Sequence, residues 1–220
     1  MATEQINKVL VKAISKNALI LTLFAIITAG LLAFTYQSTA PRIAEEEKKA
    51  AQAALLEIVP QHRHDNNMLD DIFPIPENFL QDLGLKESGQ IHLAFNKGQA
   101  VAAIIPASAP DGYSGEIKLI IGVNTDGSIA GVRVLAHKET PGLGDKVDLR
   151  KSDWILSFNH KSLNTPEADQ WAVKKDGGAF DQFTGATITP RAVVKRVKQT
   201  LEFYQNHKDL LFAQEEQEGK

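Results

Sequence analysis

The sequence predicts an α+β fold, in which a single N-terminal transmembrane helix precedes an antiparallel sheet with a C-terminal helix packed on it. Three patterns support this class: a charge-free apolar stretch near the N-terminus, two pairs of apolar runs joined by turn residues, and a helical periodicity after Pro190. Strands joined by short hairpins pair antiparallel, and a helix with one apolar face buries that face on the sheet.

Length and composition limit the classes of protein that the chain can represent. Its 220 residues suffice for one globular domain plus a short appendage, and its net charge of −3 gives no indication of nucleic-acid binding. The absence of cysteine excludes disulfides, thiolate zinc sites, iron–sulfur clusters and thiol redox chemistry. The chain also lacks the common nucleotide-binding, zinc-protease and serine-hydrolase motifs, so we expect no metal site and no stand-alone catalytic residues.

The N-terminal part predicts a membrane anchor. After a polar lead at residues 1–17, residues 18–37 carry no charge, and about 20 such residues cross roughly 30 Å of hydrocarbon. A cleaved signal peptide is the alternative, because Ser38-Thr39-Ala40 resembles a processing site. The apolar run is longer than a signal peptide needs, and Pro41 follows that site directly. We therefore expect an uncleaved helix that spans the lipid bilayer once.

Flanking charge does not decide the orientation of this span. The number of basic residues is the same before and after it: Lys8, Lys12 and Lys16 against Arg42, Lys48 and Lys49. A short N-terminus left in the cytoplasm is the economical topology, since long downstream domains cross a membrane largely regardless of charge. We expect a bacterial inner-membrane protein whose main domain lies on the periplasmic side.

Residues 38–90 predict a helical and irregular connector. Arg42–Val59 is rich in Glu, Lys, Ala and Leu, which favours a helix that continues from the anchor or stacks on it and ends before Pro60. In the polar loop that follows, His62 and His64 have no third metal ligand nearby, so we expect surface histidines. Residues 72–85 predict an irregular segment with at most one helical turn.

Residues 91–212 predict the main domain. Four strands are expected in two hairpins, at Ile91–Phe95 with Ala100–Ile105 and at Gly115–Val123 with Ile129–Ala136. Residues 106–112, rich in small side chains, are expected to form a loop between these hairpins. Trp171–Val173 is expected to form a final strand. Residues 213–220 predict a disordered polar tail.

The stretch Asp181–Pro190 combines three threonines with the start of a helical pattern. Thr189 followed by Pro190 favours an N-cap with proline at the first helical position. Thr187 then lies just before a helix N-terminus, where free N–H groups and the helix dipole favour a phosphate. An ordinary loop that leads into a helix is the alternative.

A second stretch, His137–Gly144, follows the second predicted hairpin. Two glycines and one proline in this run predict a tight loop whose backbone can approach a flat ligand closely.

Together these stretches resemble a known family. H-K-E-T-P-G-L-G at residues 137–144 and D-x-x-T-G-A-T at residues 181–187 are similar to the two signature segments of the covalent FMN-binding domain. That domain occurs in RnfG (RsxG in some bacteria), which belongs to the Rnf electron-transport complex, and in the C subunit of the sodium-translocating NADH:quinone reductase. The short N-terminal region, the anchor and the compact length resemble RnfG more than the quinone reductase protein.

The resemblance implies the site residues. Thr187 would hold FMN through a phosphodiester made by a flavin transferase from FAD, with Asp181 in the motif that this enzyme recognises. Thr184 retains the hydroxyl of the first motif position, while Gly185 and Ala186 leave room for the phosphate. The other loop would lie against the isoalloxazine ring through Glu139, Thr140, Pro141, Gly142 and Leu143. His137, Lys151 and Lys174 are weaker candidates for contact with FMN, and solvated surface residues are the alternative for both lysines.

The resemblance also implies a function. The chain would relay electrons in a membrane-bound, ion-translocating ferredoxin:NAD oxidoreductase complex. It would share in enzyme activity as a subunit of this redox-driven translocase and would perform no substrate chemistry alone. Its partners would be the other subunits of the complex, the flavin transferase during maturation, and the lipid bilayer. Two alternatives stay open, which are the C subunit of the quinone reductase and a flavin-free, membrane-anchored scaffold module.

Overall fold

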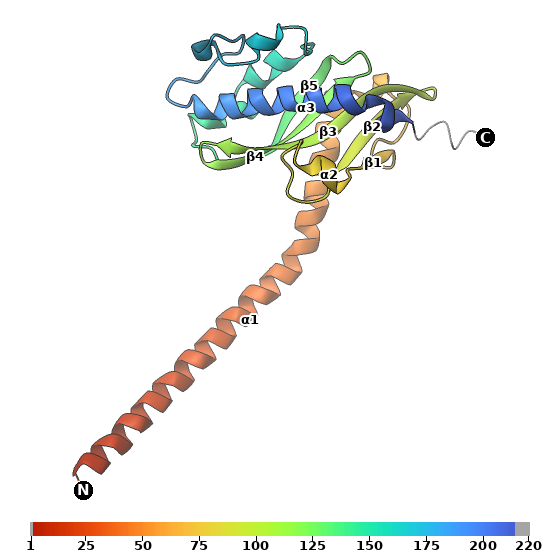
Figure 1. The fold of residues 1–220 in the computed structure, drawn as a ribbon. Coiled ribbons are helices and arrows are strands. Elements are labelled where there is room, and N and C mark those ends of the chain that lie inside the picture. The colour runs from red at the N-terminus through yellow and green to blue at the C-terminus, as the bar shows by residue number, and fades with distance from the viewer. Residues whose placement is uncertain (1, 214–220) are drawn as a thin grey trace. The chain divides into compact units, whose positions relative to one another are not determined.

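The computed structural model describes residues 2–213 of the chain. It contains two compact units, Met1–Ala50 and Ala51–Lys220. The helices are α1 (Ala2–Ile58), α2 (Glu77–Leu80) and α3 (Ile188–Phe212), and the strands are β1 (Ile72–Pro74), β2 (Gln90–Asn96), β3 (Gln99–Gly112), β4 (Gly115–Asn124) and β5 (Ile129–Ala136) (Figure 1). The polar tail expected at residues 213–220 falls, from residue 214 on, outside the described residues.

The first unit consists of the larger part of α1. Ile14–Ile43 has a mean hydropathy of 2.4 and is the single helical segment of the described residues that is long and apolar enough to cross a membrane. Thr28, Thr35 and Thr39 each donate their hydroxyl hydrogen to the carbonyl oxygen four residues earlier, at 2.8–2.9 Å. These bonds satisfy hydroxyl groups for which hydrocarbon offers no partner. The described helix runs through Pro41 without interruption, so the helix expected at Arg42–Val59 is continuous with the anchor.

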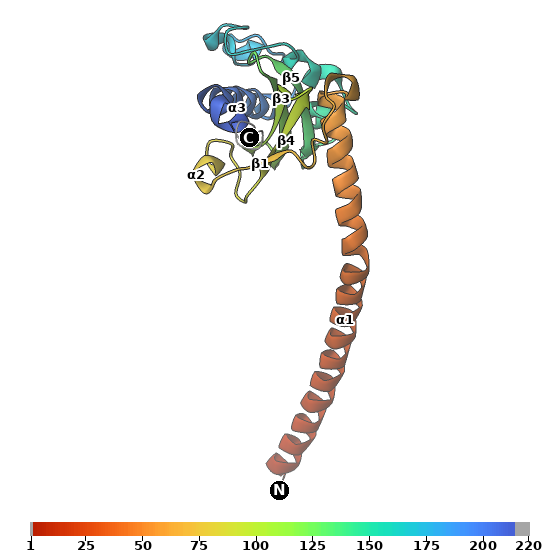
Figure 2. The same ribbon diagram turned by 90° about the vertical axis from the view of Figure 1, so that its right-hand side faces the viewer.

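The second unit is built on a five-stranded antiparallel sheet with the strand order β1-β2-β3-β4-β5. β3 and β4 form its centre, where Ile105 pairs with Ile121 and Ala109 with Ile117. In Figure 2 the sheet lies between α3 on one face and the last turns of α1, from residue 51 on, at the other. The predicted α+β class with an antiparallel sheet and a packed C-terminal helix is confirmed.

Apolar side chains cover both faces of this sheet. On the α3 face, Val193, Val197 and Leu201 pack with Ile105 and Ile121 in one buried cluster. On the opposite face, a second cluster joins Leu55, Ile58, Val59 and Met68 to Ala102, Ile104 and Ile120. Each face therefore removes its apolar strand residues from water, which is the main driving force for this arrangement.

The prediction of a loop at residues 106–112 is wrong, because β3 continues through these residues to Gly112. Ala107, Ser108 and Ala109 are buried, and α3 packs along this strand, where small side chains let the helix approach. Pro106 is tolerated because β3 pairs with β2 only as far as Ile104 and with β4 alone beyond it. The missing N–H group of proline therefore costs no bond to β2.

Two further expectations need correction. Trp171–Val173 is not a strand, because the chain turns back within a few residues: Val173 makes one isolated bridge to Phe180, and Gly178 packs on the backbone of Ala172. His64 is buried and its Nδ1 lies 3.2 Å from the carbonyl oxygen of Pro60, whereas His62 is exposed as expected. The segment at residues 72–85 contains the expected helical turn, α2, and also the unexpected strand β1.

Candidate functional site

The T-G-A-T motif forms a tight turn immediately before α3. The N–H of Ala186 donates to the carbonyl oxygen of Phe183 at 3.1 Å, and Gly185 occupies the third position of the turn with a φ of +79°. A positive φ at that position is why glycine is required there. Thr184 and Gly185 are exposed, while Ala186 and Thr187 are half-buried. The turn presents both motif threonines outside the core.

The start of α3 differs from the expectation that Thr189 is its N-cap. The helix begins at Ile188, so Thr187 occupies the N-cap position, and no side chain there accepts from the free N–H groups of the first turn. Thr189 is the second helical residue, is fully buried, and donates its hydroxyl hydrogen to Oε2 of Glu139. The Thr189 N-cap prediction is therefore wrong, because a carboxylate fifty residues earlier accepts the hydroxyl hydrogen. Pro190 falls within the first turn, where its missing N–H costs nothing.

Glu139 connects three segments from a buried position. Its Oε1 accepts from the N–H of Ser114 at 2.9 Å, in the turn between β3 and β4, and its Oε2 accepts from Thr189. Only 4% of Glu139 is exposed. Gly144 packs so closely that a Cβ there would lie 2.7 Å from both Oε2 of Glu139 and Oγ1 of Thr189. The carboxylate thus fixes the start of α3 against the glycine loop.

The second predicted loop is a turn of the same kind as the first. The N–H of Leu143 donates to the carbonyl oxygen of Thr140 at 3.1 Å, with Pro141 at the second position and Gly142 at the third with a φ of +77°. Thr140, Pro141, Gly142 and Leu143 are all exposed, Leu143 by 41%. Cδ2 of Leu143 lies 3.7 Å from the position that a Cβ on Gly185 would take. The structure therefore brings the two motif turns together.

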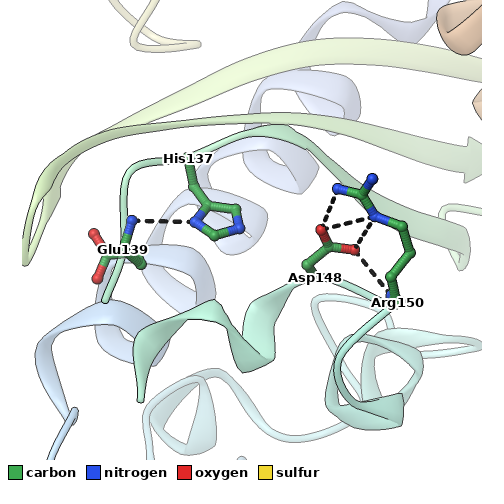
Figure 3. A network of polar contacts seen from close by, with 4 residues as sticks. All are labelled: His137, Glu139, Asp148 and Arg150. Atoms are coloured by element: carbon green, nitrogen blue, oxygen red, sulfur yellow. Dashed lines mark hydrogen bonds and ion pairs between the residues drawn. The ribbon is translucent and has the colours of Figure 1, made fainter. Parts of the chain in front are cut away.

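His137 is the first residue of the predicted stretch His137–Gly144, and its ring contacts the backbone of that stretch (Figure 3). The N–H of Glu139 donates to Nδ1 of His137 at 3.1 Å, and this bond holds the backbone at the start of the loop. Beyond the loop, Arg150 binds the carboxylate of Asp148 with Nη2 at 2.5 Å, and its guanidinium holds the pKa of Asp148 below the usual value. Arg150 itself is largely exposed, so water screens this pair.

Asp181, the expected recognition residue, is exposed and held by two neighbours. Its carboxylate lies 2.7 Å from Nζ of Lys174, and its backbone carbonyl oxygen accepts from Nε1 of Trp154 at 2.8 Å. Trp154 also packs edge-on against Phe158 and Phe183, with ring centroids 5.3 and 5.0 Å away. Trp154 was missed as a site residue because nothing in its local sequence indicates the segment that it contacts. Lys151 is exposed.

Arg191 and Asp176 were also missed. Nε and Nη2 of Arg191, in the first turn of α3, lie 2.5 and 2.6 Å from the two carboxylate oxygens of Asp176. Asp176 ends the short helix Lys174–Asp176. The spacing of four residues between Thr187 and Arg191 is the signal that could have found the arginine, because it places both side chains on one helix face.

Comparison with known proteins identifies the family. Residues 112–202 match the model of the FMN-binding domain, and residues 1–58 match the model of the RnfG N-terminal region. A relative in Pseudoalteromonas atlantica, named as the G subunit of the ion-translocating oxidoreductase complex, is 52% identical over 91% of this chain and 92% of its own length. The chain belongs to the RnfG family. Relatives of the same name in Pseudomonas aeruginosa and Vibrio cholerae are 49% and 48% identical, over 94% and 92% of this chain and 96% and 95% of their own.

Membership in the RnfG family supports the expected resemblance and favours RnfG over the quinone reductase protein. The FMN-binding match includes every residue from His137 to Thr187 that the sequence indicated. The apolar helix and the membership in the RnfG family together indicate a single-pass membrane protein that is one subunit of a larger complex.

The residues at the motif turns fit a flavin phosphate. A half-buried threonine hydroxyl stands at a helix start where the side chain of the N-cap residue, Thr187, makes no capping hydrogen bond, which suits a phosphate group. Leu143 and Ile188, exposed by 41% and 45%, offer apolar surface beside it for a flat ring.

Proposed function

We propose that this member of the RnfG family is an electron carrier within an ion-translocating oxidoreductase complex, with FMN attached covalently to Thr187. The observation that supports it best is the meeting of the two motif turns, at Leu143 and Gly185, beside the uncapped start of α3. The names of the relatives and the match to the FMN-binding domain agree with this proposal.

Attachment uses the hydroxyl of Thr187. Its oxygen bonds to the phosphorus of the FMN part of FAD, AMP leaves, and the hydroxyl proton passes to the transferase. The resulting phosphodiester keeps one negative charge, which the N–H groups at the start of α3 stabilise. Exposed Asp181 is available to the transferase, and Trp154 and Lys174 hold it in place.

The glycine loop would hold the ring of the flavin. Because Glu139 is buried and its two oxygens bind Ser114 and Thr189, the exposed groups of Thr140–Leu143 are the ones that would meet the isoalloxazine. FMN, once bound, supplies the capacity to take up and release one or two electrons, and the chain supplies position and electrostatics. The chain alone therefore converts no substrate, and it acts as the redox relay of a larger complex.

The membrane anchor keeps this domain at a membrane surface, with the N-terminus in the cytoplasm and the domain on the periplasmic side. A flavin on that side cannot be replaced from the cytoplasmic pool, which gives the covalent bond a purpose. The other subunits of the complex are the partners that give electrons to this flavin and take them from it.

In-gel fluorescence tests the proposal. Full-length chain from cells that contain the flavin transferase is denatured and separated, and the unmodified chain should give a fluorescent band. Thr187→Val should give none, whereas Thr184→Val, in the same turn, should at most label more slowly. A fluorescent Thr187→Val band would show that another residue holds the flavin. A dark band for the unmodified chain would support the flavin-free scaffold instead.

A further inference from the structure

The first turn of α3 carries a charge of the wrong sign for its position. It contains no acidic residue, and its one charged side chain is the guanidinium of Arg191. The N-terminus of a helix carries a partial positive charge, so a cation there is destabilising and an anion is stabilising. Asp176 compensates Arg191 from another segment, and Arg191 lowers the pKa of that carboxyl in return.

Arg191 also lies one helical turn from Thr187. The N–H of Arg191 donates to the carbonyl oxygen of Thr187 at 3.3 Å, so both side chains project from the same helix face. Asp176 occupies Nε and Nη2 of the guanidinium. Within the described residues, Nη1 donates to no protein group. The side chain is 44% exposed, so this free edge is open to a ligand.

We propose that Arg191 binds the phosphodiester that attaches FMN to Thr187, and that Asp176 holds the guanidinium in position for it. This inference rests on the proposed function and adds a phosphate-binding residue to it. A guanidinium carries five donors in a planar fork, so one edge binds the carboxylate while the other edge binds a phosphate oxygen. Arg191 also stabilises the negative charge on the non-bridging phosphate oxygens while the bond to Thr187 forms.

Lys195 provides a matched control. It is also a cation on α3, four residues further from Thr187, and it pairs with Asp111 through Nζ at 2.8 Å. Its side chain is 61% exposed, so its removal disturbs the core as little as removal of Arg191 does. It lies two helical turns from Thr187 and should not reach the phosphate.

The first measurement is the initial rate of flavin attachment. Full-length chain in detergent is mixed with purified transferase and FAD, and labelling is followed by in-gel fluorescence. Arg191→Gln should label about three- to tenfold more slowly. This loss in rate lies between the losses expected for removing an exposed ion pair and for removing a charge-assisted hydrogen bond. Asp176→Asn should also label more slowly, but by less than Arg191→Gln, because the guanidinium keeps its charge and loses only the partner that holds it in position. Lys195→Gln should label at the rate of the unmodified chain.

The second measurement is the phosphorus NMR spectrum of the labelled chain, which reports on the phosphodiester itself. Arg191→Gln should shift this resonance, and Lys195→Gln should not. The proposal is overturned if Arg191→Gln labels normally and leaves the resonance in place. It is equally overturned if Asp176→Asn slows labelling as much as Arg191→Gln and neither variant shifts the resonance, because the ion pair then only supports the fold. Failure of the proposed function gives a different result, which is an unlabelled chain or a labelled Thr187→Val.

Discussion

At the scale of single residues, the hydrogen bond from Thr189 to Glu139 joins the start of α3 to a segment fifty positions earlier in the chain. The order of threonine and proline at residues 187–190 indicated a helix start, and α3 begins there. The sequence could not show that Thr189 is buried against Glu139, because that contact joins residues fifty positions apart. Local capping rules assume that a threonine bonds to its own helix. A distant acceptor in the core prevented this for Thr189.

Glu139 should therefore matter for stability more than an exposed acid. Glu139→Ala leaves the buried hydroxyl of Thr189 and the N–H of Ser114 without their acceptor, which should cost about 2–4 kcal/mol in the free energy of unfolding. Denaturant unfolding of the full chain in micelles, followed by tryptophan fluorescence, measures this loss. Glu202→Ala, at an exposed position of α3, is the control and should change stability by less than about 0.5 kcal/mol. Equal effects of the two substitutions would contradict the role of Glu139.

At the scale of elements, regular patterns predicted their structures well. Both hairpins and the C-terminal helix are confirmed. The ends of the four hairpin strands lie within a few residues of the predicted ones, except for the end of β3, which continues through the predicted loop. The wrong predictions of elements concern segments whose structure depends on tertiary packing. Residues 106–112 looked like a loop because small residues and proline are common in loops, but here they allow the close approach of α3. Trp171–Val173 looked like a strand because it is apolar, but its aromatic side chain is buried in a turning segment, next to Phe158 and Phe180.

The packing of the last turn of α1 on the sheet depends on glycine in β4. A Cβ on Gly122 would lie 2.2 Å from Cγ2 of Ile58, so Gly122→Ala should push Ile58 off the sheet and cost about 1–3 kcal/mol. Its partner across the strands, Gly131, is the matched control, because a Cβ there would meet Ile58 at an ordinary 3.4 Å. Thermal unfolding of both variants in micelles measures the difference. A Gly131→Ala variant as unstable as Gly122→Ala would exclude this explanation.

At the scale of the whole molecule, composition and hydropathy predicted an anchor followed by one domain, and the family models agree with that order. The orientation in the membrane could not be read from the sequence, since equal numbers of basic residues flank the span. The topology with a periplasmic domain is therefore a proposal that needs its own test.

The lack of cysteine makes this test simple, because any introduced thiol is unique in the chain. Asp169→Cys, at an exposed position of the domain, should react with a membrane-impermeant maleimide in spheroplasts. Lys8→Cys, in the polar lead, should react only after the membrane is lysed. The reverse pattern would place the domain in the cytoplasm.

The length of α3 sets a limit on which partners this protein can serve. Its 25 residues extend over about 37 Å, at 1.5 Å per residue, and Thr187 stands at one end. Electron tunnelling rates fall exponentially with distance, so a flavin at Thr187 is insulated from any cofactor that approaches near Phe212. If Thr187 holds the flavin, as proposed, redox partners have to approach the end of the domain formed by the two motif turns. The rest of the domain surface could then contact other subunits without taking part in electron transfer.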